Sequence, residues 1–358
     1  MDAKYIEFFK QLTSTPSPSG HEEKAQRIFM DFTKPFADEV KSDINGNAIA
    51  VKYGTGHGKK PYSVMLSGHA DEIGLMVSHI DESGYVYARM IGGMDISLLP
   101  GLRLDIHHEG KTVRAIVGKK PIHMLRDGDE AKPKLEDLWL DIGAIDREDA
   151  LKKVAVGDVV TFIPQFEYLN GDFIVSKGTD DKAGVFVAAM VMNLIHKSKK
   201  IYPDVYAVST VGEEVGAKGA KTSSFDIKPM IAIALDVTFV SDHPGVDKKV
   251  YGDVGVGKGP AITIGSMINK QVLNLFKKTA EEEKIPVQFE ISPTRSGTDG
   301  DVLHNNLSGI ALAIISIPNR YMHSPNEVVS LNDMENAAKL IAGFLKRLGP
   351  DFNPYPVQ

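Results

Sequence analysis

The chain contains 358 residues, of which 42% are hydrophobic and 25% are charged, and its formal net charge is -6. This composition is ordinary for a soluble globular protein with room for one large domain or two smaller ones. The net negative charge gives no electrostatic reason to expect a nucleic acid or an anionic membrane as a partner. Because the sequence has no cysteine, disulfides and thiolate zinc sites are excluded, and any bound metal must use His, Asp and Glu.

The beginning of the chain leads to an expectation about location. Residues 1–7 lack the basic end and the apolar core of a secretion signal. No run in the sequence approaches the roughly 18 apolar residues that span a membrane. We therefore expect a cytoplasmic protein.

The first segment begins with helices and ends in a strand that leads to a histidine. Apolar residues at helical spacing predict a helix over residues 3–12, and a second helix is expected from about Glu22. The strand from Tyr62 runs into His69 and Asp71, which are two residues apart and so face the same side of an extended segment. Asp71 is therefore placed to support His69 as a metal ligand, although an isolated His-x-Asp tripeptide is more often a surface feature.

Residues 73–166 have a different pattern. Short apolar runs alternate with glycines, and the only helix expected is a brief one around residues 147–156. Many short strands with regular turn signals are typical of a small β-barrel. We predict an inserted barrel domain here, and we assign its histidines, His107, His108 and His123, to surface or core packing.

In the second half of the chain, acids and a histidine recur at the ends of apolar segments. These residues are Asp180 and Asp181 before a predicted helix, Glu213 and Glu214 after the run 205–211, Asp236 after the run 230–235, and His323 after the final strand. In open α/β sheets, ligands bind beyond the carboxyl ends of the strands, so these side chains are expected to meet there. A single acidic pair is more often a solvated turn or a helix cap. The recurrence on one chain favours a site.

The collected set indicates a metal centre. It consists of His69, Asp180, Glu213, Glu214, Asp236 and His323. Two histidines and several carboxylates without thiols suit zinc, cobalt or manganese. A pair of ions about 3.5–4 Å apart, bridged by one carboxylate, would clamp the attacking and departing oxygens of a hydrolysis. A carboxylate not used in coordination could then carry the proton.

Six short segments, taken in chain order, resemble the motifs of a known family. They are GHADEIGLMV, GTDDKAG, TVGEEVGAKGA, ALDVTF, SGTDGD and PNRYMHSP. Together they resemble the tetrahedral (TET) aminopeptidases of metallopeptidase family 42, which includes glutamyl, lysyl and deblocking aminopeptidases and some members once named endoglucanases. The likeness covers nearly the whole chain, including the barrel.

The resemblance implies an architecture. It points to a mixed-sheet α/β/α catalytic domain of the zinc-exopeptidase type, formed by residues 1–72 and 167–358. The β-barrel of residues 73–166 would be inserted into it as a dimerisation domain. In the family, dimers assemble into a hollow dodecamer with inward-facing active sites, which would restrict the substrates to peptides.

The resemblance also implies a ligand set for two divalent metal ions. One ion would be held by His69, Asp180 and Asp236. The other would be held by Asp180, Glu214 and His323, so that Asp180 bridges the two. Zinc and cobalt are the first expectations for the metal, and manganese is a third option.

Two further roles follow from the same resemblance. Glu213 would be the general base and acid of an aminopeptidase, and Asp71 would orient the first histidine. Asp180 is chosen over Asp181 as the bridge because related peptidases place this ligand two residues before a lysine or arginine. Here that residue is Lys182, where many family members have arginine.

Other functions remain as alternatives. A dipeptidase, carboxypeptidase or deacylase of the same clan would share the dinuclear geometry. A β-glucanase would use Glu213 and Asp236 as its two carboxylates, but it would give His69 and His323 no role. A non-enzymatic assembly protein is the least favoured, because all six positions of the site are filled.

The sequence leaves the preferred N-terminal residue and the native metal open. Lys258, Arg295 and Arg320 could recognise an acidic residue, although exposed cations usually serve only solubility. Zinc, cobalt and manganese all accept the expected ligands.

Overall fold

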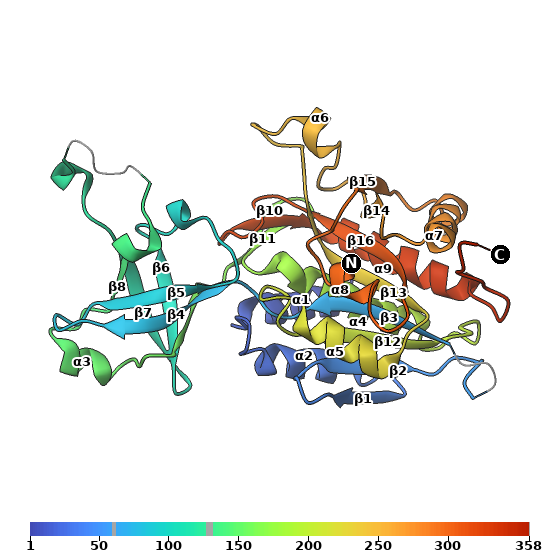
Figure 1. Ribbon diagram of the computed structural model, residues 1–358, viewed down its shortest axis with the longest axis horizontal. Coiled ribbons are helices and arrows are strands. Elements are labelled where there is room, and N and C mark those ends of the chain that lie inside the picture. Colours follow the sequence, from blue (N-terminus) through green and yellow to red (C-terminus); the bar gives the residue numbers. More distant parts are fainter. Residues whose placement is uncertain (59–61, 127–131, 358) are drawn as a thin grey trace.

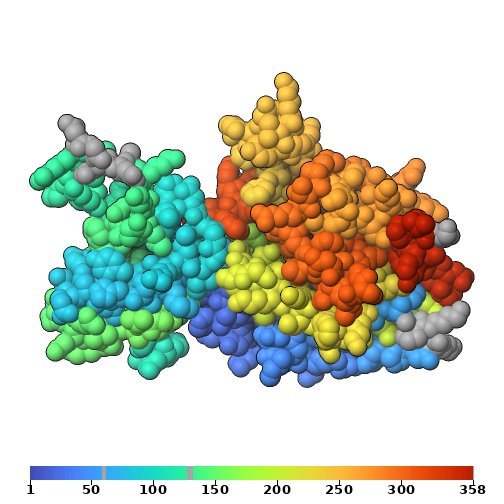
Figure 2. All heavy atoms as spheres, in the orientation of Figure 1, coloured from blue at the N-terminus to red at the C-terminus, as the bar shows by residue number. Residues whose placement is uncertain are grey.

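The computed structural model describes residues 1–58, 62–126 and 132–357 (Figure 1). The chain forms a large body around an eight-stranded sheet and a smaller lobe around a closed barrel. Figure 2 shows the barrel lobe, in cyan and green, beside the main body. Among the described residues, no helix combines the length and the apolar character needed to cross a bilayer.

The large sheet has the order β1-β2-β12-β3-β13-β16-β14-β15. Its strands are β1 (Glu39–Ser42), β2 (Ala48–Lys52), β3 (Ser63–His69), β12 (Asp204–Thr210), β13 (Ile231–Phe239), β14 (Ala261–Gly265), β15 (Gln288–Ser292) and β16 (Ala311–Asn319). The four central strands β12, β3, β13 and β16 run parallel to one another. Their carboxyl ends therefore meet at one edge of the sheet, where ligands bind in open α/β folds.

Helices cover both faces of this sheet. On one face lie α1 (Ala3–Ser14), α2 (Glu23–Thr33), α4 (Thr179–Ile195), α7 (Lys270–Glu283) and α9 (Leu331–Arg347). On the other face, α5 (Lys218–Ile227) and α8 (Gly300–Leu303) pack against the central strands, and the short α6 (Lys248–Tyr251) projects from the body (Figure 1). The result is an α/β/α sandwich.

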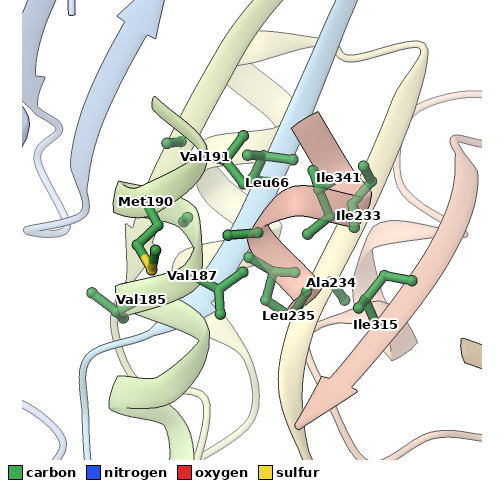
Figure 3. Packing of buried hydrophobic residues seen from close by; sticks show 14 of the residues in the cluster. Leu66, Val185, Val187, Met190, Val191, Ile233, Ala234, Leu235, Ile315 and Ile341 are labelled. Carbon is green, nitrogen blue, oxygen red and sulfur yellow. The ribbon is translucent and has the colours of Figure 1, made fainter. Parts of the chain in front are cut away.

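Helix α4 forms the centre of the core. Almost all of its residues are buried, which fits its apolar sequence. Figure 3 shows Val191 of this helix beside Leu66 of β3, and Ile233 of β13 beside Ile341 of α9, all in one hydrophobic cluster. A helix that is apolar all round is expected in the interior of a large domain.

Two glycines let α4 approach β3 closely. A Cβ atom built on Gly68 would lie 2.6 Å from the carbonyl carbon of Gly184, closer than real atoms pack. The first turn of α4 is thereby held against the carboxyl end of β3. This contact brings the acids of the GTDDKAG segment next to His69.

The barrel has the strand order β4-β5-β8-β7-β6-β9. It comprises β4 (Gly74–Ile80), β5 (Val86–Ile91), β6 (Arg103–His108), β7 (Lys111–Gly118), β8 (Trp139–Asp141) and β9 (Val159–Phe162), with α3 (Arg147–Leu151) and three short 3-10 helices, η1 (Ile96–Leu98), η2 (Ile122–Met124) and η3 (Leu135–Asp137). Its apolar residues form a core of their own. A three-stranded sheet, β10 (Phe166–Asn170), β11 (Phe173–Ser176) and β17 (Glu327–Ser330), belongs to the main body.

The expected fold class, a mixed-sheet α/β/α domain with an inserted barrel, is confirmed. The boundaries at residues 73 and 166 stay a prediction, although all barrel strands lie between Gly74 and Phe162. His107 contacts Thr161 at 2.8 Å and His108 contacts Asp158 at 2.9 Å within the barrel.

Two details of the sequence-based elements were wrong. Helix α3 ends at Leu151 rather than near residue 156, because Lys152 is already its C-cap. Strand β13 does not end before Asp236 but continues to Phe239, since the parallel pairing with β16 extends that far. The acid therefore lies inside a strand.

Candidate metal centre

The six collected residues come together in one cleft at the carboxyl edge of the sheet. The cleft has a volume of about 470 Å³ and is lined by all of them. They are His69 at the end of β3, Asp180 at the start of α4, Glu213 and Glu214 after β12, Asp236 in β13, and His323 after β16. Residues from five separate segments thus face a common space.

Asp180 lies between the two histidines. Its Oδ1 is 3.2 Å from Nε2 of His69, and its Oδ2 is 3.0 Å from Nε2 of His323. Nε2 of His323 is also 3.4 Å from Oε1 of Glu214. One carboxylate thus contacts both imidazoles, as a bridging ligand would.

Asp181 occupies a different position from its neighbour. Its Oδ2 accepts a hydrogen bond from the backbone N–H of His69 at 3.1 Å, and its Oδ1 accepts one from Gly184 at 2.8 Å. A carboxylate oxygen of Asp181 nevertheless lies within 4.8 Å of ligand atoms of His69 and Asp236, and Asp180 groups in the same way with His69 and Glu214. The structure therefore adds Asp181 to the residues that surround the centre.

Asp71 connects the two sides of the cleft. Nδ1 of His69 lies 3.0 Å from the backbone carbonyl oxygen of Asp71 and 3.5 Å from its carboxylate. The carboxylate accepts hydrogen bonds from the backbone N–H groups of Glu213 and Glu214, at 3.0 and 3.2 Å, and from the hydroxyl of Ser19 at 2.7 Å. The same residue therefore positions the imidazole and the loop that carries both glutamates.

Burial and mutual repulsion perturb the acids of the cleft. Burial raises the pKa of Glu213 to about 8, and nearby carboxylates contribute in the same direction although His69 opposes it. Burial likewise raises the pKa values of Asp181 and Asp236 well above the usual range. Burial would also raise the pKa of Asp180, but hydrogen bonds with the two histidines outweigh it and hold that pKa below the usual range. Such shifts are typical of functional clefts.

The pKa values of the two histidines are also raised, but by the neighbouring carboxylates rather than by burial. Burial alone would lower their pKa values, but the surrounding carboxylates outweigh it. The pKa of His323 rises to about 11 through Asp180 and Glu214, and that of His69 rises well above its ordinary value through Asp180 and Asp71. The cleft is therefore an environment that strongly favours positive charge.

The residues fit a divalent metal centre. Imidazole nitrogens and carboxylate oxygens are the ligands that zinc, cobalt and manganese accept. Two sets of three such atoms lie within 4.8 Å of one another, one with His69, Asp181 and Asp236 and one with His69, Asp180 and Glu214. Cations bound there would replace the protons that the raised pKa values indicate.

Glu327 is a supporting residue that the sequence did not reveal. Its carboxylate is buried and accepts hydrogen bonds from the hydroxyl of Thr179 at 2.7 Å, the N–H of Asp180 at 3.0 Å and the N–H of His323 at 2.9 Å. It therefore ties together the backbones of two candidate ligands that are far apart in the sequence. In the sequence, only its position four residues after His323 could have indicated a supporting role for Glu327.

Asp299 is a second buried acid that was missed. Its Oδ2 accepts hydrogen bonds from Ser67 at 2.6 Å and Thr210 at 2.7 Å, and so links the ends of β3 and β12. Its charge contributes to the raised pKa of Glu213. The residue lies in the SGTDGD segment, which marked the region without giving Asp299 a role.

A buried ion cluster lies behind the centre. Glu72 accepts hydrogen bonds from Lys177 at 2.6 Å and from Lys182 at 2.7 Å, and all three side chains are at most 3% exposed. Glu72 leads into the barrel, whereas the lysines follow the return of the chain from it. The cluster therefore joins the two segments that connect the barrel to the main body.

The comparison with protein families decides the affiliation of the chain. A model of the M42 glutamyl aminopeptidases matches residues 46–340. This chain belongs to the M42 family of peptidases. The match includes all six residues of the centre and the whole barrel.

Relatives of this M42 peptidase cover nearly its full length. The lysyl aminopeptidase of Pyrococcus furiosus is 34% identical, over 97% of this chain and 99% of the relative. The structure of aminopeptidase APDkam598 from the archaeon Desulfurococcus kamchatkensis has a TM-score of 0.90 at 35% identity, covering 97% of this chain and 96% of that one. The structure of the Pyrococcus horikoshii TET1 peptidase, which can assemble into a tetrahedron or a large octahedral shell, has a TM-score of 0.83 at 30% identity. The match covers 96% of this chain and 100% of that one. The expected resemblance to TET aminopeptidases is confirmed.

Proposed function

We propose that this M42 peptidase is a metal-dependent aminopeptidase that removes N-terminal residues from peptides. The observation that carries the proposal is the carboxylate of Asp180 between His69 and His323, with the carboxylate of Glu213 facing the same space. Oε2 of Glu213 lies 3.9 Å from Nε2 of His69, too far for a hydrogen bond. Glu213 belongs to neither of the two groups of three clustered ligand atoms, so in this proposal it lies beside the centre as a free carboxylate.

The ligands are assigned as follows. His69, Asp180 and Asp236 would hold one divalent ion, and Asp180, Glu214 and His323 would hold the other. Asp180 is the candidate for the shared ligand, because its two oxygens face different histidines. The oxygens of its neighbour already accept backbone hydrogen bonds. Two bound ions would polarise the scissile carbonyl and lower the pKa of a water molecule.

Glu213 carries the proton in this reaction. It removes a proton from the attacking water as the oxygen adds to the carbonyl carbon. It then delivers that proton to the departing amine nitrogen as the C–N bond breaks. The products are a free amino acid and a peptide shortened by one residue. Asp71 positions the base by accepting the hydrogen bond from the N–H of Glu213.

The proposal also includes the substrates, the oligomeric state and the cellular location of the protein. Its substrates are peptides, and neither nucleic acid nor a membrane is a partner. The barrel of residues 73–166 mediates dimerisation, and the dimers form a dodecamer in the cytoplasm. The assembly part of the proposal is supported by the similarity to the Pyrococcus horikoshii TET1 peptidase, which can assemble into a tetrahedron or a large octahedral shell.

The substitution Glu213→Gln tests the role of the base. We expect metal content to be unchanged and kcat to fall by about 10²–10⁴-fold, the usual contribution of a general base. Glu148→Gln, at an exposed position in the barrel lobe, is the matched control. Full activity of the metal-loaded Glu213→Gln enzyme would overturn the mechanism.

A peptide panel tests the reaction class. Chelated enzyme should be inactive, and zinc, cobalt or manganese should restore hydrolysis of peptides with a free amine but not of N-acetylated ones. Equal hydrolysis of N-acetylated peptides would favour a carboxypeptidase or a deacylase. Activity on cellulose that survives chelation would favour a glucanase.

A further inference from the structure

The cleft extends beyond the metal centre. Its remaining wall is formed by residues 216–217, 237–239 and 296–298 together with Asp301, Val302 and Met322. Its volume of about 470 Å³ is in the range of small-molecule sites. An aminopeptidase places a single residue on the amine side of the scissile bond. The side chain of that residue must therefore occupy the space next to the centre.

The charge of this wall is one-sided. Among the described residues that line the cleft there is no lysine and no arginine. Outside the metal centre, Asp301 is the only charged side chain in the described lining. Val302, the next residue in the sequence, and Met322 contribute apolar surface to the same cleft. The wall thus combines an apolar part with one negative charge.

Asp301 has acceptor capacity left for a ligand. Its Oδ1 accepts hydrogen bonds from the backbone N–H of Ser296 at 2.7 Å and from its hydroxyl at 2.8 Å, and its Oδ2 accepts one from the N–H of Gly297 at 3.0 Å. These bonds hold the loop against the wall of the cleft. A carboxylate offers about four acceptor positions, so that a further donor can be bound.

The cations that could have recognised an acidic residue lie elsewhere. Arg320 forms a two-point ion pair with Asp242, at 2.9 and 2.7 Å. Arg295 lines a neighbouring cleft of about 560 Å³, which shares residues 237–239 with the first. Residues of α6, which projects from the body in Figure 1, also line this second cleft. An acidic side chain in this part of the cleft would meet the carboxylate of Asp301, and the described lining offers no lysine or arginine to pair with it.

We propose that this cleft is the subsite for the N-terminal residue and that Asp301 selects cationic side chains, those of lysine and arginine, and rejects acidic ones. This inference rests on the aminopeptidase activity proposed above. The methylene groups of the substrate side chain lie on Val302 and Met322. Its cationic end donates to Oδ2 of Asp301, because a charge-assisted hydrogen bond is stronger than a neutral one.

The test compares kcat/KM of the metal-loaded enzyme for lysyl, norleucyl and glutamyl p-nitroanilides. Norleucine has the apolar chain of lysine without its charge. We expect the order lysyl, norleucyl, glutamyl for the unchanged enzyme. Asp301→Asn should lower the lysyl-to-norleucyl ratio about three- to tenfold, the effect of a partly screened ion pair. Asp226→Asn, which removes the same charge at an exposed position on α5 outside the described lining of the cleft, should leave the ratio unchanged.

A second measurement needs no variant. Raising the ionic strength should lower the lysyl-to-norleucyl ratio of the unchanged enzyme, because salt screens the attraction. A preference for the glutamyl substrate, an unchanged ratio in Asp301→Asn, or an equal loss for both substrates would each overturn the role of Asp301 and leave the aminopeptidase activity standing. Failure to hydrolyse any of the three would overturn the proposed function, and the subsite with it.

Discussion

The substitution Glu327→Gln separates support of the metal centre from chemistry within it. The carboxylate of Glu327 accepts three hydrogen bonds, from Thr179, Asp180 and His323, and is 2% exposed. Glutamine has nearly the same size but only one acceptor oxygen. Whichever way the amide turns, its NH₂ group faces at least one backbone N–H that previously had an acceptor.

The expected loss can be worked out from these contacts. A hydrogen bond to a charged group contributes about 1.5–3 kcal/mol, and an unsatisfied buried donor costs a similar amount. Because Glu327 holds the backbones of Asp180 and His323, we expect this energy to appear as weaker binding of the second ion. A loss of about 10- to 100-fold in metal affinity corresponds to about 1.4–2.7 kcal/mol and is typical of residues that orient metal ligands.

The assay is a competition between protein and chelator, with the metal content measured at each chelator concentration. Glu290→Gln is the matched control. Its carboxylate also accepts hydrogen bonds from hydroxyl groups, those of Thr263 and Ser316, but it lies in β15 and lines the neighbouring cleft rather than the metal centre. Activity at saturating metal should be largely restored in Glu327→Gln. Metal affinity equal to that of the unchanged protein would refute the positioning role.

Two further predictions concern stability. Gly68→Ala should lower the free energy of unfolding by about 1–3 kcal/mol, because its Cβ would lie 2.6 Å from the backbone of Gly184, whereas Gly93→Ala, with nothing within 4 Å, should change it by less than about 0.5 kcal/mol; urea denaturation measures both. Glu72→Gln should destabilise the protein by about 3–5 kcal/mol at pH 7, because two buried lysines lose their counter-charge. Burial alone would raise the pKa of Glu72, but the lysines outweigh it and lower that pKa to about 2, so its stabilising effect is present above about pH 4.5 and is lost as the pH falls towards 2. Hydrogen exchange should therefore show that the difference in unfolding free energy between the unchanged protein and Glu72→Gln becomes smaller as the pH falls. A difference that does not depend on pH would contradict the stabilising role of the ion cluster.

The sequence could reveal the parts of the site that follow local rules. Apolar runs that stop at polar residues mark strand ends, and parallel strands bring those ends together. His69, Glu213 and Glu214 were found in this way. Asp236 was also found, although its strand runs past it, because pairing with the neighbouring strand decides where a strand stops.

The remaining parts depend on contacts that no local pattern encodes. Glu327 meets the backbone of Asp180, which lies 147 residues away in the sequence. Asp299 meets Ser67, which lies 232 residues away, and in the sequence neither acid differs from one on the surface. Arg320 looked available for a substrate until the structure showed its pairing with Asp242. Burial and partner identity are properties of the folded chain.

The arrangement of the central strands also determines when the centre can exist. Its residues are contributed in the order β3, α4, β12, β13 and the segment after β16, from His69 to His323. No shorter piece of the chain contains both histidines. During synthesis the centre therefore cannot form until the ribosome has released the chain through His323. The wide spacing of these residues along the sequence thus makes the centre one of the last features of the described fold to be completed.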